Sequence, residues 1–314
     1  MRVISKSPVL FAVVVALASF GCSDLNSQVQ EPKEPSQQFK DYWYAGEAEL
    51  TRYKLEQARY GEIHEGDAVL IFVTEDFRTD KQVKYEGGER KNVASVLKLN
   101  ATRKFFTGIY PYSMMSSIFT PVDPSASTYK VTTSSQEWCG HTFSQLNLQR
   151  NQYKGKLFSY FQDEGDQEFS LNNALLEDEI WNKIRLNPES LPTGSIELIP
   201  GTMFLRLSHL DFKVQKATAS MQEVQDTTLS DRPLMKYRVE YQDVPRVLEI
   251  TFESNFPYQI VAWEEEGRSG FGQNAKTLTT RAVRTHTMKS AYWGQHDVAD
   301  APLRAELGLD PANY

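Results

Sequence analysis

The sequence predicts an α+β fold, mainly antiparallel β, with one or more curved sheets and one main amphipathic helix near residues 173–186. From Tyr42 onward, short segments rich in Tyr, Phe, Val, Ile and Thr are separated by Gly, Asp, Asn and Pro, which is typical of antiparallel strands joined by turns. Two alternating runs within residues 234–253 are separated by three turn residues at 243–245, and this pattern predicts a hairpin.

The first residues have the layout of a secretory leader. Two basic residues precede an apolar run at 9–18, and this run is too short to span a membrane as a helix. The leader ends at Cys22, where the preceding Gly21 suits a bacterial lipobox and Phe20 suits it poorly. We expect residues 1–21 to be a lipoprotein signal peptide and Cys22 to carry lipid; the alternative is release by an ordinary signal peptidase.

Residues 22–41 are polar and contain two prolines, a composition that predicts a flexible tether. The remaining residues 42–314 are expected to form a β-rich domain with a possible seam near 187–195. A lipid on Cys22 would anchor this domain in the cell envelope. The predicted location is the outer membrane, with the domain facing the periplasm.

The charge balance argues against nucleic acid as a partner. The chain has 34 basic and 41 acidic residues, and removal of residues 1–21 takes away two basic residues and no acidic one, which leaves a net charge of about −9. No basic patch is interleaved with aromatic residues, so nucleic-acid binding is disfavoured.

The strands of the first half can be placed in order. Alternation within 48–55 changes phase midway, which indicates a β-bulge. The apolar run 68–73 has the length of a buried strand. A further strand is expected within 95–110, and segments 127–149 and 151–165 look like neighbouring strands of a meander.

The helix is predicted from a stripe of Leu176, Ile180 and Ile184 at four-residue spacing. Asn172 or Asn173 could cap its start, and Pro188 would stop it. We expect the stripe to pack against a sheet face.

The second half returns to a strand pattern, and its end is expected to form a short helix. Strands are predicted at 195–199, 212–224, 234–242, 246–253, 258–266 and 276–288. The glycines of 267–272 predict a hairpin loop rather than a phosphate cradle, because strand-like sequence follows them.

Cys139 and His141 are the low-priority candidates for catalysis. Residues two apart on a strand share a face, so the pair could begin a Cys–His nucleophile site or a zinc site. The other histidines have no ligand-like spacing, and nothing marks an oxyanion donor. A half-buried sheet position for Cys139 is the favoured interpretation, and no metal or other cofactor is expected.

The stretch 107–123 is the best candidate for ligand binding. It gathers Tyr110, Tyr112, Met114, Met115, Ile118 and Phe119 in a segment interrupted by Pro111 and Pro121. The prolines predict irregular structure, and the side chains offer adaptable apolar contacts. The stretch would be a binding surface if exposed and an irregular core plug if buried, and the plug is favoured.

Segments 41–77, 104–123 and 136–143, the last containing Trp-Cys-Gly-His, resemble a family of lipoproteins from Bacteroidota. The resemblance implies an envelope location and no particular activity. Some members carry the label of the Maf septum-formation inhibitor, a nucleotide pyrophosphatase family with an N-terminal S-x-S-P-R-R signature. Val9 and Leu10 replace the arginines here, within the leader, so we judge that label misapplied. Residues 236–266 also resemble envelope proteins whose curved sheet holds an apolar ligand.

These observations favour a non-enzymatic envelope lipoprotein that binds an apolar or envelope-derived ligand or a protein partner. The first alternative is a hydrolase or metal-dependent enzyme that uses Cys139 and His141. The second is a structural scaffold in an envelope complex.

Overall fold

The computed structural model describes residues 35–123 and 125–309. Cys22, the leader and most of the predicted tether lie outside the described residues. Gln37–Trp43, which begins inside the predicted tether, forms helix α1, whose first turn is capped by the Ser36 side chain accepting from the Phe39 N–H. Phe39 and Trp43 are buried. The ordered domain therefore begins a few residues before the position expected from composition.

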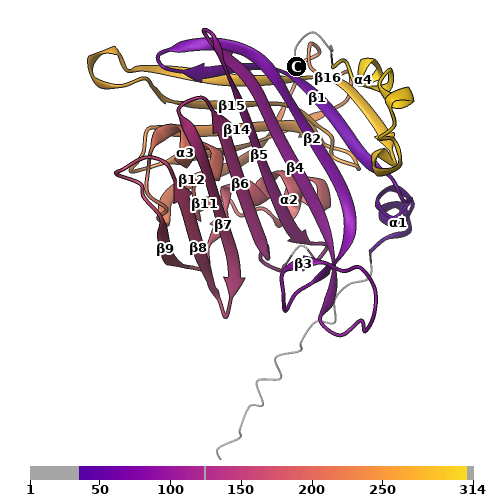
Figure 1. Cartoon of the computed structure of the whole chain (residues 1–314). Coiled ribbons are helices and arrows are strands. Elements are labelled where there is room, and N and C mark those ends of the chain that lie inside the picture. Colours follow the sequence, from indigo (N-terminus) through magenta and orange to yellow (C-terminus); the bar gives the residue numbers. More distant parts are fainter. Residues whose placement is uncertain (1–34, 124, 310–314) are drawn as a thin grey trace, which may run out of the picture. The chain divides into compact units, whose positions relative to one another are not determined.

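One curved, open and almost wholly antiparallel sheet contains all sixteen strands of the described residues (Figure 1). Its strands are β1 (Ala48–Arg59), β2 (Glu62–Arg78), β3 (Val83–Lys84), β4 (Val93–Thr107), β5 (Tyr110–Pro121), β6 (Lys130–Glu137), β7 (Gly140–Gln149), β8 (Gln152–Ser159), β9 (Gln167–Asn172), β10 (Leu175–Leu176), β11 (Gly194–Ile199), β12 (Gln215–Val224), β13 (Leu234–Tyr241), β14 (Arg246–Glu253), β15 (Ile260–Ser269) and β16 (Lys276–Ser290).

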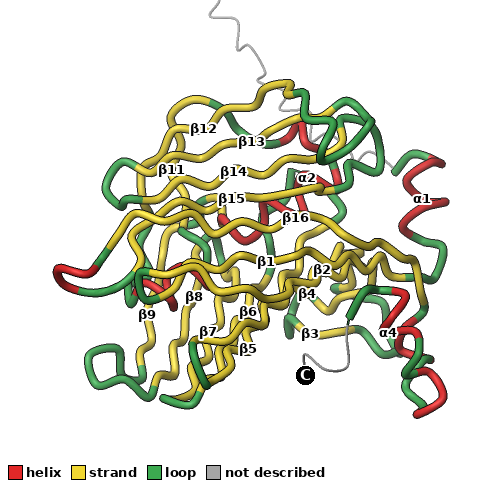
Figure 2. Tube along the Cα trace, turned by 90° about the horizontal axis from the view of Figure 1, so that it is seen from above, coloured by secondary structure: helices red, strands yellow, loops and turns green. Residues whose placement is uncertain are grey.

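The two halves of the sheet meet where the last strand pairs with the first. The order is β10-β11-β12-β13-β14-β15-β16-β1-β2-β4-β5-β6-β7-β8-β9, with β3 paired to β2. Seen from above in Figure 2, strands β12–β16 run across the view while β5–β9 turn away from them. The sheet thus bends into two arms.

The short helices α2 (Ile180–Leu186) and α3 (Thr202–Ser208) lie between these arms (Figure 1). We call the face that carries them the inner face. A fourth helix, α4 (Leu303–Glu306), follows β16. No helix in residues 35–123 and 125–309 is long and apolar enough to cross a bilayer.

The predicted helix at 173–186 is only half as long as expected. The segment forms strand β10, then a 3₁₀ turn at Glu177–Glu179, and α2 begins at Ile180. The three acidic residues of the turn are buried and accept hydrogen bonds from other elements, which an exposed helical turn would not allow. The stripe of Leu176, Ile180 and Ile184 is fully buried, as predicted.

Several local predictions are confirmed. The register of β1 against β16 shifts between Arg52 and Tyr53, where the alternation changes phase. The hairpin at 243–245 joins β13 to β14, and the glycine-rich loop joins β15 to β16. The short helix expected at the end of the chain is α4, which follows a 3₁₀ turn at Val298–Asp300.

The expectation of irregular structure at 107–123 is wrong, because β5 is a regular strand paired with both β4 and β6. Pro111 lies opposite Phe106 and Pro121 opposite Val96. In this hairpin, hydrogen-bonded and non-hydrogen-bonded residue pairs alternate, starting with a hydrogen-bonded pair beside the two-residue turn at 108–109. Both prolines therefore occupy non-hydrogen-bonded positions toward β4. The pairing with β6 covers only residues 113–119. Neither proline therefore interrupts a hydrogen bond of the sheet.

Candidate functional site

Helix α3 is fixed to the inner face by its first residue. The Thr202 N–H and hydroxyl both donate to the Asp178 carboxylate at 3.0 Å, and its hydroxyl lies 2.5 Å from that of Thr133 on β6. A Cβ on the preceding Gly201 would lie 2.4 Å from Oε1 of the buried Glu177, so glycine permits this close approach. The helix ends at His209, which has a left-handed backbone conformation.

A cavity of about 700 Å³ lies beside α3, over strands β6–β9. We call it the main cavity. Its wall is mixed in character. The apolar part is formed by Tyr60, Leu157, Phe161, Leu205, Leu210, Phe212 and Phe271; the polar part by Arg59, Thr133, Glu137, Cys139, Thr142, Ser144, Gln162, Asp163, Glu164, Gln167, Thr202, Arg206, His209 and Asp211.

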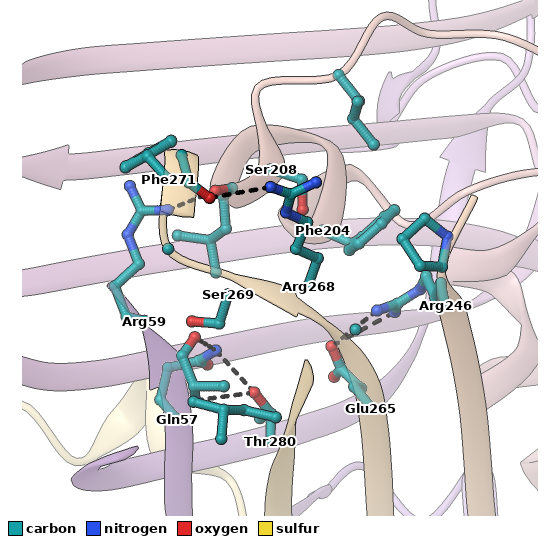
Figure 3. A pocket seen from close by; sticks show the side chains of 18 residues that line it. Gln57, Arg59, Phe204, Ser208, Arg246, Glu265, Arg268, Ser269, Phe271 and Thr280 are labelled. Atoms are coloured by element: carbon teal, nitrogen blue, oxygen red, sulfur yellow. Dashed lines mark hydrogen bonds and ion pairs between the residues drawn. The ribbon is translucent and has the colours of Figure 1, made fainter. Parts of the chain in front are cut away.

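A second cavity of about 400 Å³ lies between α3 and strands β1 and β14–β16 (Figure 3). We call it the side cavity. It shares Arg59, Leu210 and Phe271 with the main cavity, so the two adjoin at the end of α3. Figure 3 shows the Arg246–Glu265 pair within its wall.

Buried charges close the inner side of the side cavity. Arg246 donates to Glu177 and lies 3.4 Å from Glu265, and Glu265 also pairs with Arg103. Tyr241 donates its hydroxyl to Glu177 at 2.6 Å. Burial alone would raise the pKa of Glu265, but the charges of Arg103 and Arg246 outweigh it and hold this pKa at about 2. Each carboxylate has its counter-charge, so this network is structural.

Two arginines in the wall of the main cavity lack such a complete set of charged and hydrogen-bonded partners. Arg59 is 6% exposed and Arg206 is 8% exposed. Arg206 lies 3.7 Å from Glu137, and its Nε and Nη1 have no hydrogen-bond partner among the described residues. Arg59 donates to the Leu207 carbonyl at the end of α3, and its Nε also has no partner there.

Seven aromatic side chains gather at and beside the main cavity, and four of them line it: Tyr60, Phe161, His209 and Phe271. We call this group the aromatic rim: Tyr60, Tyr110, Trp138, Tyr160, Phe161, His209 and Phe271. Neighbouring ring centroids lie 5.4–6.1 Å apart for five of the pairs, and the Tyr110 hydroxyl donates to that of Tyr60 at 3.1 Å. Trp138, Tyr160 and Phe271 are each more than half exposed.

Cys139 and His141 do not form a catalytic pair in this structure. Cys139 lies in the two-residue turn between β6 and β7, where the alternation of a strand does not apply. Its exposed side chain lines the main cavity, so the expected half-buried position is wrong. His141 is exposed on β7 and does not line that cavity. The described residues contain no cluster of three or more metal-ligating side chains.

The thiol is also not activated. A hydrogen bond with Glu137, together with the charge of that carboxylate, raises the pKa of Cys139 above its usual value. A reactive thiolate needs the opposite shift.

We therefore expect slow alkylation of Cys139 in spite of its exposure. In a full chain carrying Cys22→Ser, iodoacetamide should react several-fold more slowly with the folded protein than with the urea-unfolded protein at pH 8, because less thiolate is present. Glu137→Gln should speed the folded-state reaction, while Glu164→Gln, a second acid of the same cavity, should change it little. Equal effects of both substitutions would contradict the role given to Glu137.

The ligand candidates of β5 divide between the two faces of the sheet. Tyr112 and Met114 are buried on the inner face, where Tyr112 stacks on Phe105 and has almost no exposed surface. Met115 is exposed on the outer face, and Phe119 stacks on Phe77 there. Tyr110 belongs to the aromatic rim. The five residues therefore do not form one binding surface.

The comparisons with known proteins give no further guide, because no protein-family model, curated protein or solved structure matches the chain. The resemblance to Bacteroidota lipoproteins stays an expectation.

The sequence pattern singled out Cys139 but missed the other residues that form the main cavity. A signal for Arg59 was present, since the alternation that buries Tyr53 and Leu55 continues through Gln57 to Arg59. The same alternation runs from Val131 to Glu137 on β6. Helix α3, which supplies Arg206, spans only seven residues and gives no recognisable periodic pattern.

Proposed function

We propose that this protein is a non-enzymatic binding protein of the cell envelope, and that the main cavity holds a small ligand with a substantial apolar part. The observation that carries the proposal is the combination of a cavity of about 700 Å³, a partly apolar wall and exposed aromatic side chains in and beside that wall. Binding sites for small molecules have this size and this mixture of apolar walls with a few polar groups.

The location rests on the leader sequence. The lipobox-like segment ending at Cys22 supports a lipid anchor in the envelope, with the outer membrane and the periplasmic side as the proposed place. An envelope-derived, membrane-soluble compound is the ligand class that suits this location.

An enzymatic role has less support. Cys139 has a raised pKa, and His141 does not line the cavity that Cys139 enters.

The proposal can be tested with N-phenyl-1-naphthylamine, an uncharged probe that fluoresces in apolar surroundings. The delipidated full chain should bind about one probe per molecule with micromolar affinity. Ser144→Phe should reduce the affinity at least tenfold, because Ser144 is buried in the cavity wall on β7 and the larger side chain occupies the cavity.

His141→Phe is the matched control, since it adds the same ring to the same strand at an exposed position outside the cavity wall. Its affinity for the probe should equal that of the natural chain. Melting temperatures of both variants show whether the fold is kept. Probe binding that is absent, or that survives Ser144→Phe in a folded variant, would contradict the proposed function.

A further inference from the structure

We infer that the ligand of the main cavity is an anionic amphiphile, whose single carboxylate or phosphate group binds at Arg206 and Arg59 while its apolar chain lies along the apolar wall. This inference rests on the proposed function and names the chemical class of its ligand. It follows from the balance of buried charge, from the donors left without acceptors, and from the position of these donors relative to the apolar wall.

The buried charges of the cavity wall do not cancel. Arg59, Arg206 and Glu137 are each more than nine-tenths buried. Glu137 is the only buried acid among these wall residues, and it also accepts the Cys139 N–H at 2.6 Å. One positive charge therefore remains in excess, and a buried excess charge is costly unless a counter-charge binds next to it.

The unpartnered donors belong to the same side chains. Nε and Nη1 of Arg206 have no acceptor among the described residues, and Nε of Arg59 has none either. A carboxylate or phosphate can accept from such guanidinium N–H groups in charge-assisted hydrogen bonds. The guanidinium of Arg206 also lies over Phe161, with Cζ 4.6 Å from the ring centroid, and this contact helps to hold it in the cavity wall.

The surroundings of Arg206 agree with a missing counter-charge. Burial lowers the pKa of its guanidinium; Glu164 offsets part of this shift and the nearby charge of Arg59 adds to it. Three acids at the mouth, Asp163, Glu164 and Asp211, are more exposed than the arginines, and Glu164 is paired with His209. Water screens these outer charges more than the buried ones.

The apolar part of the ligand has a place beside the arginines. Leu205, adjacent to Arg206 on α3, lines the cavity together with Leu157 and Phe212. An amphiphile whose anion contacts Arg206 would therefore meet apolar side chains directly next to its head group. A fully polar anion would leave this wall in contact with water, and an uncharged apolar molecule would leave the guanidinium without an acceptor.

The test compares four compounds with the same twelve-carbon chain in displacing N-phenyl-1-naphthylamine: dodecanoate, dodecyl phosphate, dodecanol and dodecyltrimethylammonium. We expect at least one of the two anions to bind about tenfold or more tighter than dodecanol, since a charge-assisted hydrogen-bonded contact contributes at least that factor. The cation should bind weakest. The anion that binds tighter indicates whether the natural ligand is a carboxylate lipid or a phosphate-bearing lipid.

The variant is Arg206→Met combined with Glu137→Gln, which removes both charges of the buried pair and avoids leaving one of them alone. It should bind dodecanol as the natural chain does and lose most of the preference for the anions. Arg268→Met is the control, because this arginine lines only the side cavity and is exposed. Arg206→Lys should keep part of the preference.

The two proposals fail in different ways. Equal affinities for dodecanol and both anions in the natural chain would overturn the anion site while leaving the cavity as an apolar binding site. A preference for anions that persists in the folded double variant would also overturn it. Failure of every compound, including the uncharged probe, would instead contradict the proposed function.

Discussion

Arg246→Met is expected to lower the free energy of unfolding by about 3–5 kcal/mol, the loss typical when one partner of a buried ion network is removed. Arg246 is 5% exposed, and its Nε donates to Glu177 at 2.9 Å while its guanidinium also faces Glu265. Methionine keeps much of the volume but leaves Glu177 with only the Tyr241 hydroxyl. Urea unfolding, followed by circular dichroism at pH 7.5, measures the change.

The control for this substitution is Arg281→Met. Arg281 pairs with Glu264 across β15 and β16 at 3.3 Å, and both side chains are more than two-fifths exposed. Exposed ion pairs contribute at most about 1 kcal/mol. Adding Glu177→Gln to Arg246→Met should recover part of the lost stability, because the unpaired charge is then removed. Similar losses for Arg246→Met and Arg281→Met would contradict a buried, charge-dependent network.

Local patterns predicted the local structure of this sheet well. The phase change in residues 48–55 marks the register shift of β1, and the turn at 243–245 joins β13 to β14. These features depend on residues that are neighbours in sequence. The pairing of β16 with β1 joins segments more than two hundred residues apart, and no short-range pattern specifies it.

The site was harder to predict because burial changes the meaning of a charged residue. The sequence pattern predicts a solvated first turn of a helix for Glu177, Asp178 and Glu179. Each of these residues is instead buried and accepts hydrogen bonds from a different element. Nothing in the sequence around Arg206 distinguishes it from a surface arginine, and only the position of α3 places it in the cavity wall. The prediction for Cys139 failed in the opposite direction. Cysteine is usually buried, but the position of Cys139 in a tight turn exposes it.

The pH dependence of stability should identify Asp178 as a carboxyl that is protonated near neutral pH. Burial raises the pKa of Asp178 to about 7, against the two hydrogen bonds from Thr202 that favour the carboxylate. In the unfolded chain the pKa is about 3.9. Between these values the folded state holds a proton that the unfolded state has released, so this residue makes stability fall as pH rises from about 4 to 7. The slope is about 1.4 kcal/mol per pH unit in the middle of the window, or roughly 4 kcal/mol over all of it.

Asp178→Asn should therefore remove this slope between pH 5 and 8 and make the protein more stable than the natural chain at pH 8, because asparagine keeps an acceptor for Thr202 without the buried charge. Asp226→Asn is the matched control, since Asp226 accepts from the N–H and hydroxyl of Thr228 in the same way but is only partly buried, and these hydrogen bonds lower its pKa. All other titratable groups are present in every variant, so differences between unfolding curves at pH 5, 6, 7 and 8 isolate each aspartate. A slope that Asp178→Asn leaves unchanged would mean that Asp178 is already ionised at pH 5. The charge of its carboxylate would then have to be balanced inside the sheet, next to the residue that anchors α3.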